Sequence, residues 1–345
     1  MTPRASKTLR RGAAVFARSL ILIAVAIAAL LWLAGREPVL RWAAEQGAAW
    51  TGGRLTLTGV QGSIYGPIRV DALRYATPDF SVTAKGIEFD WALPTLLLRD
   101  RLVVQGLRVR EVDVHIARFT EEPLPLPATL RLPFALDVRP AQVKRIGVQA
   151  GETRLEFPGL RFTLENPGER YRLAISRLET PWGGGSAELR LGASPPYALG
   201  GEGVLARSKD GLPYTADFRL GGTLERVTLD AAGKMAPGEG SARVALTPFA
   251  RRLWSRAEVA VRNLDPAKLA AGWPTARLTL GLAVRMEEDG ALDGSVKAEN
   301  ALPGPFDRDR LPLKKLEAGL GGKPEQLRLA DIALDLGEAG RFAGS

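Results

Sequence analysis

The sequence predicts a mainly β protein: an N-terminal transmembrane helix, then an elongated, curled β-sheet groove built as a taco-like stacked array with a few short helices. Three observations lead to this fold class. An uncharged apolar run follows a basic N-terminal segment. From residue 54 onward, apolar residues recur at every second position, which is typical of strands. The chain also holds 38 Gly and 24 Pro among 345 residues, and so many turn residues favour short strands over long helices.

The N-terminus is predicted to be a membrane anchor. Residues 1–18 are basic and no acidic residue precedes Glu37. The anchor is predicted over residues 19–35. At 1.5 Å per residue its uncharged part spans about 24 Å, slightly less than a ~30 Å hydrocarbon core. That uncharged part consists of Ser19, Leu20, Ile21, Leu22, Ile23, Ala24, Val25, Ala26, Ile27, Ala28, Ala29, Leu30, Leu31, Trp32, Leu33 and Ala34. Because Lys and Arg stay on the cytoplasmic side, the remainder of the chain is predicted to be exported.

A cleaved signal peptide is the alternative interpretation of the same segment. Cleavage requires small residues at positions −3 and −1 after the apolar core. A cut after Ala34 would place Trp32 at −3, and Ala26 and Ala28 lie inside the apolar run. An uncleaved anchor is therefore favoured, and both interpretations place the body of the chain outside the cytoplasm.

The composition excludes several functional classes. The chain has no Cys and a single His, which leaves no thiolate chemistry and almost no zinc or triad chemistry. We therefore expect no enzyme activity and no cofactor. The net charge of +9 would suggest a nucleic-acid partner. More than half of that excess precedes the apolar run, so no nucleic-acid partner is predicted.

The exported part is expected to divide into three regions. Residues 36–120 are predicted to form a membrane-proximal helix and a β module, with a helical turn at 93–99 and a turn at Gly86. Residues 121–140 contain five Pro residues and are interpreted as a boundary, because Pro is excluded from central strands. Residues 141–345 are predicted to be a repetitive β groove. Strands are expected to number roughly 20–25, too many for one flat sheet.

Apolar residues at period two are the candidate lining of this groove, because they share one face of each strand. The face is expected to shift by one residue near Arg110 through a β-bulge. The candidates are Leu107, Val109, Val112, Val114, Ile116, Leu160, Phe162, Leu164, Leu278, Leu280, Leu282, Val284 and Met286.

Two polar patterns could indicate catalytic or cofactor sites. Residues 201–206 match the loose dinucleotide pattern GxGxxA, but no βαβ frame surrounds them, so a hairpin loop is favoured. Asp113 and His115 lie two residues apart on one predicted strand. No nucleophile can be placed beside them, and a solvent-facing polar row is the favoured interpretation. No catalytic or metal-binding residue is predicted.

Four segments behind the anchor resemble the TamB family of AsmA-like, bridge-type lipid transporters, inner-membrane subunits of the translocation and assembly module. They are GVQGSIYGP at 59–67, GIEFDW at 86–91, VRNLDPAKL at 261–269 and NALPGPFD at 300–307. Each segment is short, but their order behind an anchor is fairly specific. The resemblance covers essentially the whole chain.

The resemblance implies a single-pass inner-membrane protein whose bulk is periplasmic. It implies an apolar β groove that carries phospholipid acyl chains in outer-membrane biogenesis, assists outer-membrane protein and autotransporter assembly, or both. Family members are usually longer and meet a TamA-like outer-membrane barrel partner through a C-terminal region. That region is missing here, so the chain is expected to represent an N-terminal portion. The alternative is a non-transporting periplasmic scaffold or partner-binding protein.

Overall fold

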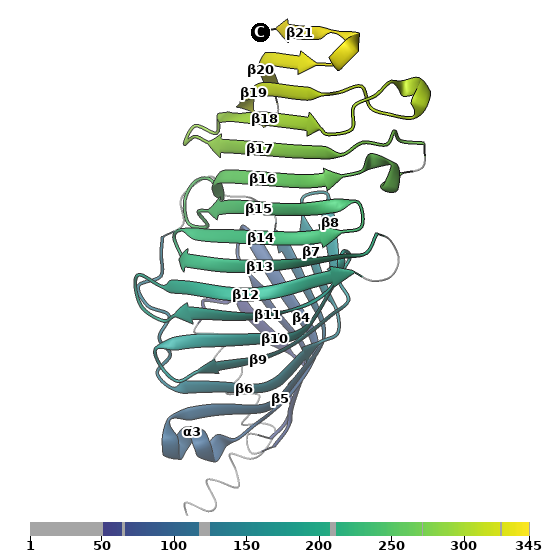
Figure 1. Ribbon diagram of the computed structural model, residues 1–345. Coiled ribbons are helices and arrows are strands. Elements are labelled where there is room, and N and C mark those ends of the chain that lie inside the picture. Colours follow the sequence, from purple (N-terminus) through teal and green to yellow (C-terminus); the bar gives the residue numbers. More distant parts are fainter. Residues whose placement is uncertain are drawn as a thin grey trace, which may run out of the picture.

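The computed structural model describes residues 51–63, 66–116, 125–207, 212–270, 272–324 and 326–344. These residues form one mixed sheet of 21 strands (Figure 1). The prediction of a mainly β fold with few helices is confirmed. The predicted anchor and the helix after it lie outside the described residues, and no helix among the described residues is long and apolar enough to span a membrane.

The strands are 2–16 residues long. The strands of the first part are β1 (Leu55–Thr58), β2 (Gln61–Gly62), β3 (Ile68–Ala76), β4 (Phe80–Trp91), β5 (Arg101–Ile116), β6 (Ala135–Val143), β7 (Ile146–Ala150) and β8 (Thr153–Phe157). The rest are β9 (Gly159–Asn166), β10 (Arg170–Thr180), β11 (Gly183–Gly192), β12 (Ala198–Arg207), β13 (Tyr214–Thr223), β14 (Val227–Met235), β15 (Gly238–Leu246), β16 (Trp254–Leu264), β17 (Leu278–Met286), β18 (Leu292–Asn300), β19 (Lys315–Lys323), β20 (Gln326–Asp335) and β21 (Arg341–Gly344).

Helical segments in the described part of the chain are short. α3 (Leu93–Arg99) confirms the predicted helical turn; it has Pro94 in its first turn and ends where Asp100 adopts φ 49°. Three 3-10 helices lie between later strands: η1 (Pro266–Lys268), η2 (Phe306–Arg308) and η3 (Gly337–Ala339). The side chain of Asp265 caps η1 by accepting a hydrogen bond from the Ala267 N–H at 3.3 Å.

Strand pairing follows the chain with one crossover. β1 and β2 both pair with β3, and β3 pairs with β4 and β4 with β5. β5 then pairs in parallel with β6 and β7, which pair in turn with β9 and β8. From β9 to β21 each strand pairs antiparallel with the next. Parallel neighbours cannot be joined by a tight hairpin and need a longer crossover connection, and 18 residues separate β5 from β6.

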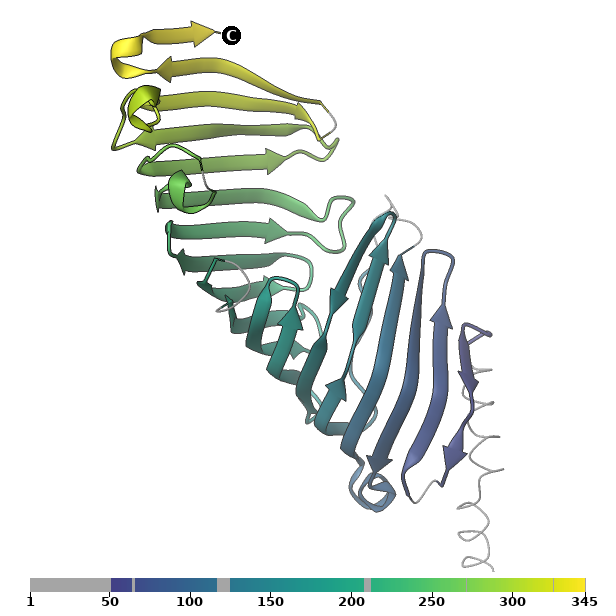
Figure 2. The same cartoon turned by 90° about the vertical axis from the view of Figure 1, so that its right-hand side faces the viewer.

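The sheet is curled rather than flat. In Figure 1 the strands from β9 to β21 lie one above another, while β4, β7 and β8 run behind them at a different angle. Figure 2 shows the two parts meeting at an open angle, with the blue and purple strands on one side and the green and yellow strands on the other. This shape confirms the expected long curled sheet. Strands twist relative to their neighbours, so a sheet of this many strands curls instead of staying flat.

Residues 127–130, near the end of the connection from β5 to β6, form hydrogen bonds with residues at the ends of later strands. The N–H of Leu130 donates to the Ala193 carbonyl at 2.9 Å. The Tyr171 hydroxyl donates to the Leu130 carbonyl, and the Tyr197 hydroxyl donates to the Pro127 carbonyl. Tyr197 and Ala193 are almost fully buried. The Pro-rich stretch therefore packs on the later strands, and its last residues, from Ala135 onward, belong to β6.

Residues 121–140 were expected to be a boundary outside central strands, but Pro140 lies within the central strand β6. The pairing of β6 with β9 shifts between Val138 and Ala141, and no paired partner falls to Pro140 on either neighbouring strand. The irregularity removes the need for a ladder hydrogen bond at that position, which is how a strand accommodates Pro.

The expected turn at Gly86 and the expected bulge at Arg110 are both wrong. β4 runs straight through Gly86, and β4 and β5 keep one register on both sides of Arg110, from Ile87–Val109 to Lys85–Glu111. No residue is inserted. Gly86 instead adopts φ 61°, a left-handed conformation that L side chains avoid. The apolar alternation changes phase at this point in both strands.

The phase change keeps apolar side chains on one face. Val70, Ile87, Val109 and Val143 belong to a buried cluster on one side of the change. Leu73, Ala84, Val112 and Ile146 lie on its other side and pack against the same cluster. The core therefore sits on one face of the first strands, which is the face that continues along the rest of the sheet.

Candidate functional site: the apolar face

Two rows of directly paired residues run along one face, one from β3 to β19 and the other from β4 to β20. The register links each member to the next across neighbouring strands, so their side chains share a face. The first apolar row is Ile68, Phe89, Leu107, Ala141, Phe162, Ile175, Ala187, Gly203, Phe218, Ala231, Ala242, Val259, Leu282, Val296 and Ala318. No polar side chain interrupts it.

The second apolar row lies beside the first on the same face. Its members are Trp91, Val104, Val138, Leu164, Leu173, Leu189, Gly201, Leu220, Leu229, Val244, Ala257, Val284, Gly294, Leu320 and Leu329. Together the two rows make a continuous apolar strip, hereafter the apolar face, that extends from β3 to β20.

The apolar face changes from covered to open along its length. At its beginning Ile68 is 5% exposed and Ala141 is 0% exposed. From Phe162 to Leu282 no member of the first row is buried. Val259 and Leu282 are 38% and 36% exposed, and Leu329 in the second row is 55% exposed. Most members of the later part are therefore half-buried or exposed, while Val284 and Ala318 remain buried.

The structure places the sequence-predicted lining residues in several rows. Leu107, Phe162 and Leu282 fall in the first apolar row, and Leu164 and Val284 in the second. Val109 and Leu160 both pair with Val143 in a row beside the first. The others extend further along their strands: Val112, Val114 and Ile116 on β5, and Leu278, Leu280 and Met286 on β17.

The small members of the rows were not among the candidates. Ala187, Gly203, Ala231 and Ala242 occupy four of the positions between Ile175 and Val259. Gly203 belongs to the segment 201–206, which was expected to be a hairpin loop and instead lies inside β12. Ala and Gly carry little apolar signal in a sequence pattern, and only the pairing register reveals their place.

The opposite face carries charges. A directly paired row there contains Glu188, Glu202, Arg219, Asp230, Arg243 and Glu258. Arg243 Nε donates to Asp230 Oδ1 at 2.5 Å, and this hydrogen bond raises the pKa of Arg243. The predicted separation into one apolar and one polar face is thus present from strand to strand.

A large hollow lies on the polar face rather than on the apolar face. Its volume is about 1080 Å³. The charged row lines it together with a second row, and the first apolar row contributes the residues between them. In the second row Ser186, Asp217 and Ser241 alternate with Val204, Ala232 and Ala260. Side chains alternate along a strand, so the intervening residues of the first apolar row point their side chains to the apolar face. Only their backbone atoms form the floor of the hollow.

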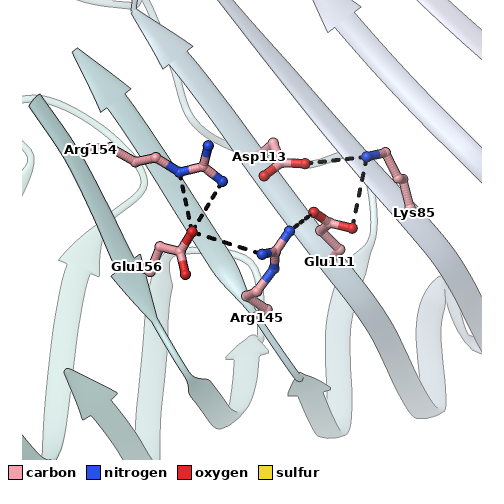
Figure 3. A network of polar contacts seen from close by, with 6 residues as sticks. All are labelled: Lys85, Glu111, Asp113, Arg145, Arg154 and Glu156. Atoms are coloured by element: carbon pink, nitrogen blue, oxygen red, sulfur yellow. Dashed lines mark hydrogen bonds and ion pairs between the residues drawn. The ribbon is translucent and has the colours of Figure 1, made fainter. Parts of the chain in front are cut away.

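A network of ion pairs stabilises the polar side of the first strands (Figure 3). Lys85 Nζ lies 3.5 Å from Asp113 Oδ2 and 3.7 Å from Glu111 Oε2. Arg145 pairs with Glu111 and reaches Glu156, whose Oε1 lies 3.0 Å from Arg154 Nη2. The network connects β4, β5 and β8 through Arg145, which lies in the turn between β6 and β7. Asp113 thus takes part in an ion-pair network on the polar side of the sheet.

The network predicts a pH dependence of stability. The hydrogen bond from Arg145 lowers the pKa of Glu111 below its ordinary value of 4.5. A carboxylate with a depressed folded pKa stabilises the fold above its unfolded pKa and loses that contribution as pH falls through the folded value. We expect Glu111→Gln to be less stable than the parent at pH 7, with the difference shrinking below pH ~4.5. Denaturant titrations of both proteins at pH 7 and at a pH below ~4.5 test this. A difference in the free energy of unfolding that stays constant between the two conditions would contradict it.

Comparisons of the chain with family models, curated proteins and solved structures find no match. Among the described residues no group of three or more His, Asp or Glu is placed to hold a metal ion.

Proposed function

We propose that the protein is an inner-membrane-anchored periplasmic protein that carries phospholipid acyl chains along its apolar face and thereby supports outer-membrane biogenesis. The continuity of the two apolar rows across the sheet is the observation that carries this proposal. An open apolar strip in water has a large free-energy cost unless something apolar covers it, since soluble proteins rarely expose patches beyond a few hundred Å².

Acyl chains match the geometry of the apolar face. Each buried CH₂ group contributes about 0.8 kcal/mol, so a chain of many methylenes gains affinity by lying along the rows. The exposure of Val259, Leu282 and Leu329 leaves the strip open on one side, and a headgroup can remain in water there. Movement along the strip exchanges one apolar contact for another of similar energy.

The resemblance to the TamB family supports the same proposal from the sequence. From this resemblance we also propose that the protein assists the assembly of outer-membrane proteins and autotransporters. It would do so together with a TamA-like barrel partner in the outer membrane. Residues 19–35 are proposed to be the anchor that holds the protein in the inner membrane.

A non-transporting scaffold that binds a partner protein is the second candidate. The hollow of about 1080 Å³ on the polar face favours it, because a path for acyl chains along the apolar face makes no use of a hollow on the other face. In this case the apolar face would be an interface with another protein.

Lipid bound to the purified full chain separates these two candidates. The chain is extracted from membranes, washed in detergent and analysed for phospholipid by mass spectrometry. Because the anchor itself retains lipid, the control is a chain with an intact anchor and a charge on the apolar face. The transport proposal predicts more lipid on the parent than on the control. Equal amounts in two folded proteins would favour the scaffold.

A further inference from the structure

The apolar face contains one recess where β13 to β16 meet η1. Its volume is about 390 Å³, and Tyr214, Ala216, Met235, Val261, Leu264 and Leu269 contribute side chains to its wall. Almost no polar atom lines it. Its volume lies within the range of about 300–1,000 Å³ that is typical of small-molecule sites.

Glycines make room for this recess. Ala216, Gly233, Gly240 and Val261 are directly paired in one row on the apolar face. The two glycines present no side chain, and the next row on the same strands carries only Ala231 and Ala242. A Cβ built on Gly240 would have the Ala260 carbonyl oxygen, at 3.6 Å, as its nearest neighbour. This is an ordinary van der Waals distance, so the space above Gly240 is free.

A strand irregularity builds the far wall. The pairing of β16 with β17 shifts between Val261 and Leu264, and Asn263 between them adopts φ 54°. A bulge of this kind redirects side chains, and it brings Leu264 to the same recess as Val261. η1 follows immediately, and Asp265 fixes it by accepting hydrogen bonds from Ala267 and Ala276. Leu269 at its end completes the wall.

The chemistry of the recess restricts its occupant. Ordered water needs two to four polar partners, which an apolar lining does not supply. A peptide segment would bury backbone groups without partners, at a cost of several kcal/mol in general terms. A single inserted side chain would leave space, since a cavity of about 150 Å³ already admits a benzene-sized ligand. A flexible hydrocarbon chain meets none of these obstacles.

We propose that this recess, the glycine pocket, binds the methyl end of one phospholipid acyl chain and is a resting site on the path along the apolar face. The inference rests on the proposed function and adds a defined position to it. The two apolar rows guide the chain, and the glycine pocket holds its end at β13–β16.

The test uses the full chain in vesicles of phosphatidylethanolamine and phosphatidylglycerol that contain a phospholipid with a diazirine at the end of one acyl chain. After irradiation, crosslinked peptides are mapped by mass spectrometry. The proposal predicts that crosslinks concentrate on peptides containing Met235, Val261 and Leu264. Gly240→Leu fills the pocket and should lower these crosslinks about tenfold, while crosslinks on the peptide containing Leu282 remain.

Two further variants keep the test decisive. Gly281→Leu adds the same side chain to the opposite face, where a Cβ meets no atom within 4 Å, and it should change nothing. Leu269→Asp alters the wall from outside the strands, and it should lower the pocket crosslinks if Gly240→Leu does not fold. Crosslinks spread evenly along the rows would overturn the glycine pocket and leave the proposed function standing. Absence of crosslinks from the whole apolar face would overturn both.

Discussion

Leu282→Arg is expected to lower the phospholipid bound to the purified full chain at least about tenfold beyond what the anchor retains, while the protein remains folded. Leu282 lies in the first apolar row on β17, with Val259 on one side and Val296 on the other. Acyl chains that lie along this row would contact a charge that hydrocarbon cannot solvate. The fold should tolerate the change, because Leu282 is 36% exposed and a long Arg side chain can extend to water.

Ala283→Arg is the matched control for this variant. Ala283 is the next residue of β17 and pairs with Glu258 and Ser295 on the polar face, so an added Arg faces water and a carboxylate. It should leave both lipid content and stability near the parent values. Mass spectrometry gives the lipid content, and circular dichroism checks the fold. If Leu282→Arg unfolds the chain as a packed core would, the apolar face is a core and the scaffold is the better candidate.

Gly203→Val is expected to destabilise the fold by about 1–3 kcal/mol. Gly203 lies in the first apolar row between Ala187 and Phe218. The Phe218 ring covers it so closely that an added Cβ would lie 2.3 Å from the ring's Cζ atom and 2.6 Å from the Ser186 carbonyl oxygen. Either the ring or the backbone must shift. The measurement is the free energy of unfolding from denaturant titration of the full chain.

Gly200→Val, on the same strand, is the control for backbone effects. A Cβ on Gly200 has no neighbour within 4 Å, and Gly200 pairs with Arg190 and Gly221 on the polar face. Because Gly in a strand interior has an entropic cost of roughly 0.5–1 kcal/mol, this change should be neutral or slightly stabilising. Equal losses in the two variants would mean that Phe218 does not depend on the space above Gly203.

The alternation of apolar and polar residues was sufficient to predict the faces. Leu278, Leu280, Leu282, Val284 and Met286 share a side in any strand that contains them, because the period of two is a local property of the backbone. The fold class and the approximate number of strands follow from the same pattern and from the turn residues between runs. Pairing partners are not needed for these predictions.

The continuity of the rows could not be predicted from the same pattern. Leu107 is joined to Phe162 through Ala141, and that link depends on the parallel pairing of β5 with β6 across a crossover. Gly86 looked like a turn because a glycine between two apolar runs has that meaning in most hairpins. In the folded chain it is a strand residue that reverses the alternation.

The two hollows depend on the curl of the whole sheet and on small residues. The recess at Gly240 arises because the register aligns it with Gly233 and because a bulge redirects Leu264. The larger hollow on the polar face arises where the charged row and the second row that lines it follow the curl. The spacing of glycines or charges within one strand does not reveal which residues of neighbouring strands they lie beside, so neither hollow could be predicted from it.

A photo-crosslinking residue placed at two positions of β17 tests the central claim most directly. Leu280 lies on the apolar face between Val261 and Ala298, and Arg285 lies on the polar face between Arg256 and Asp293. With the full chain in native membranes, a crosslinker at position 280 should capture phospholipid and one at position 285 should not. Equal capture at both positions, or capture of protein alone at position 280, would contradict the assignment of the apolar face as a path for lipid.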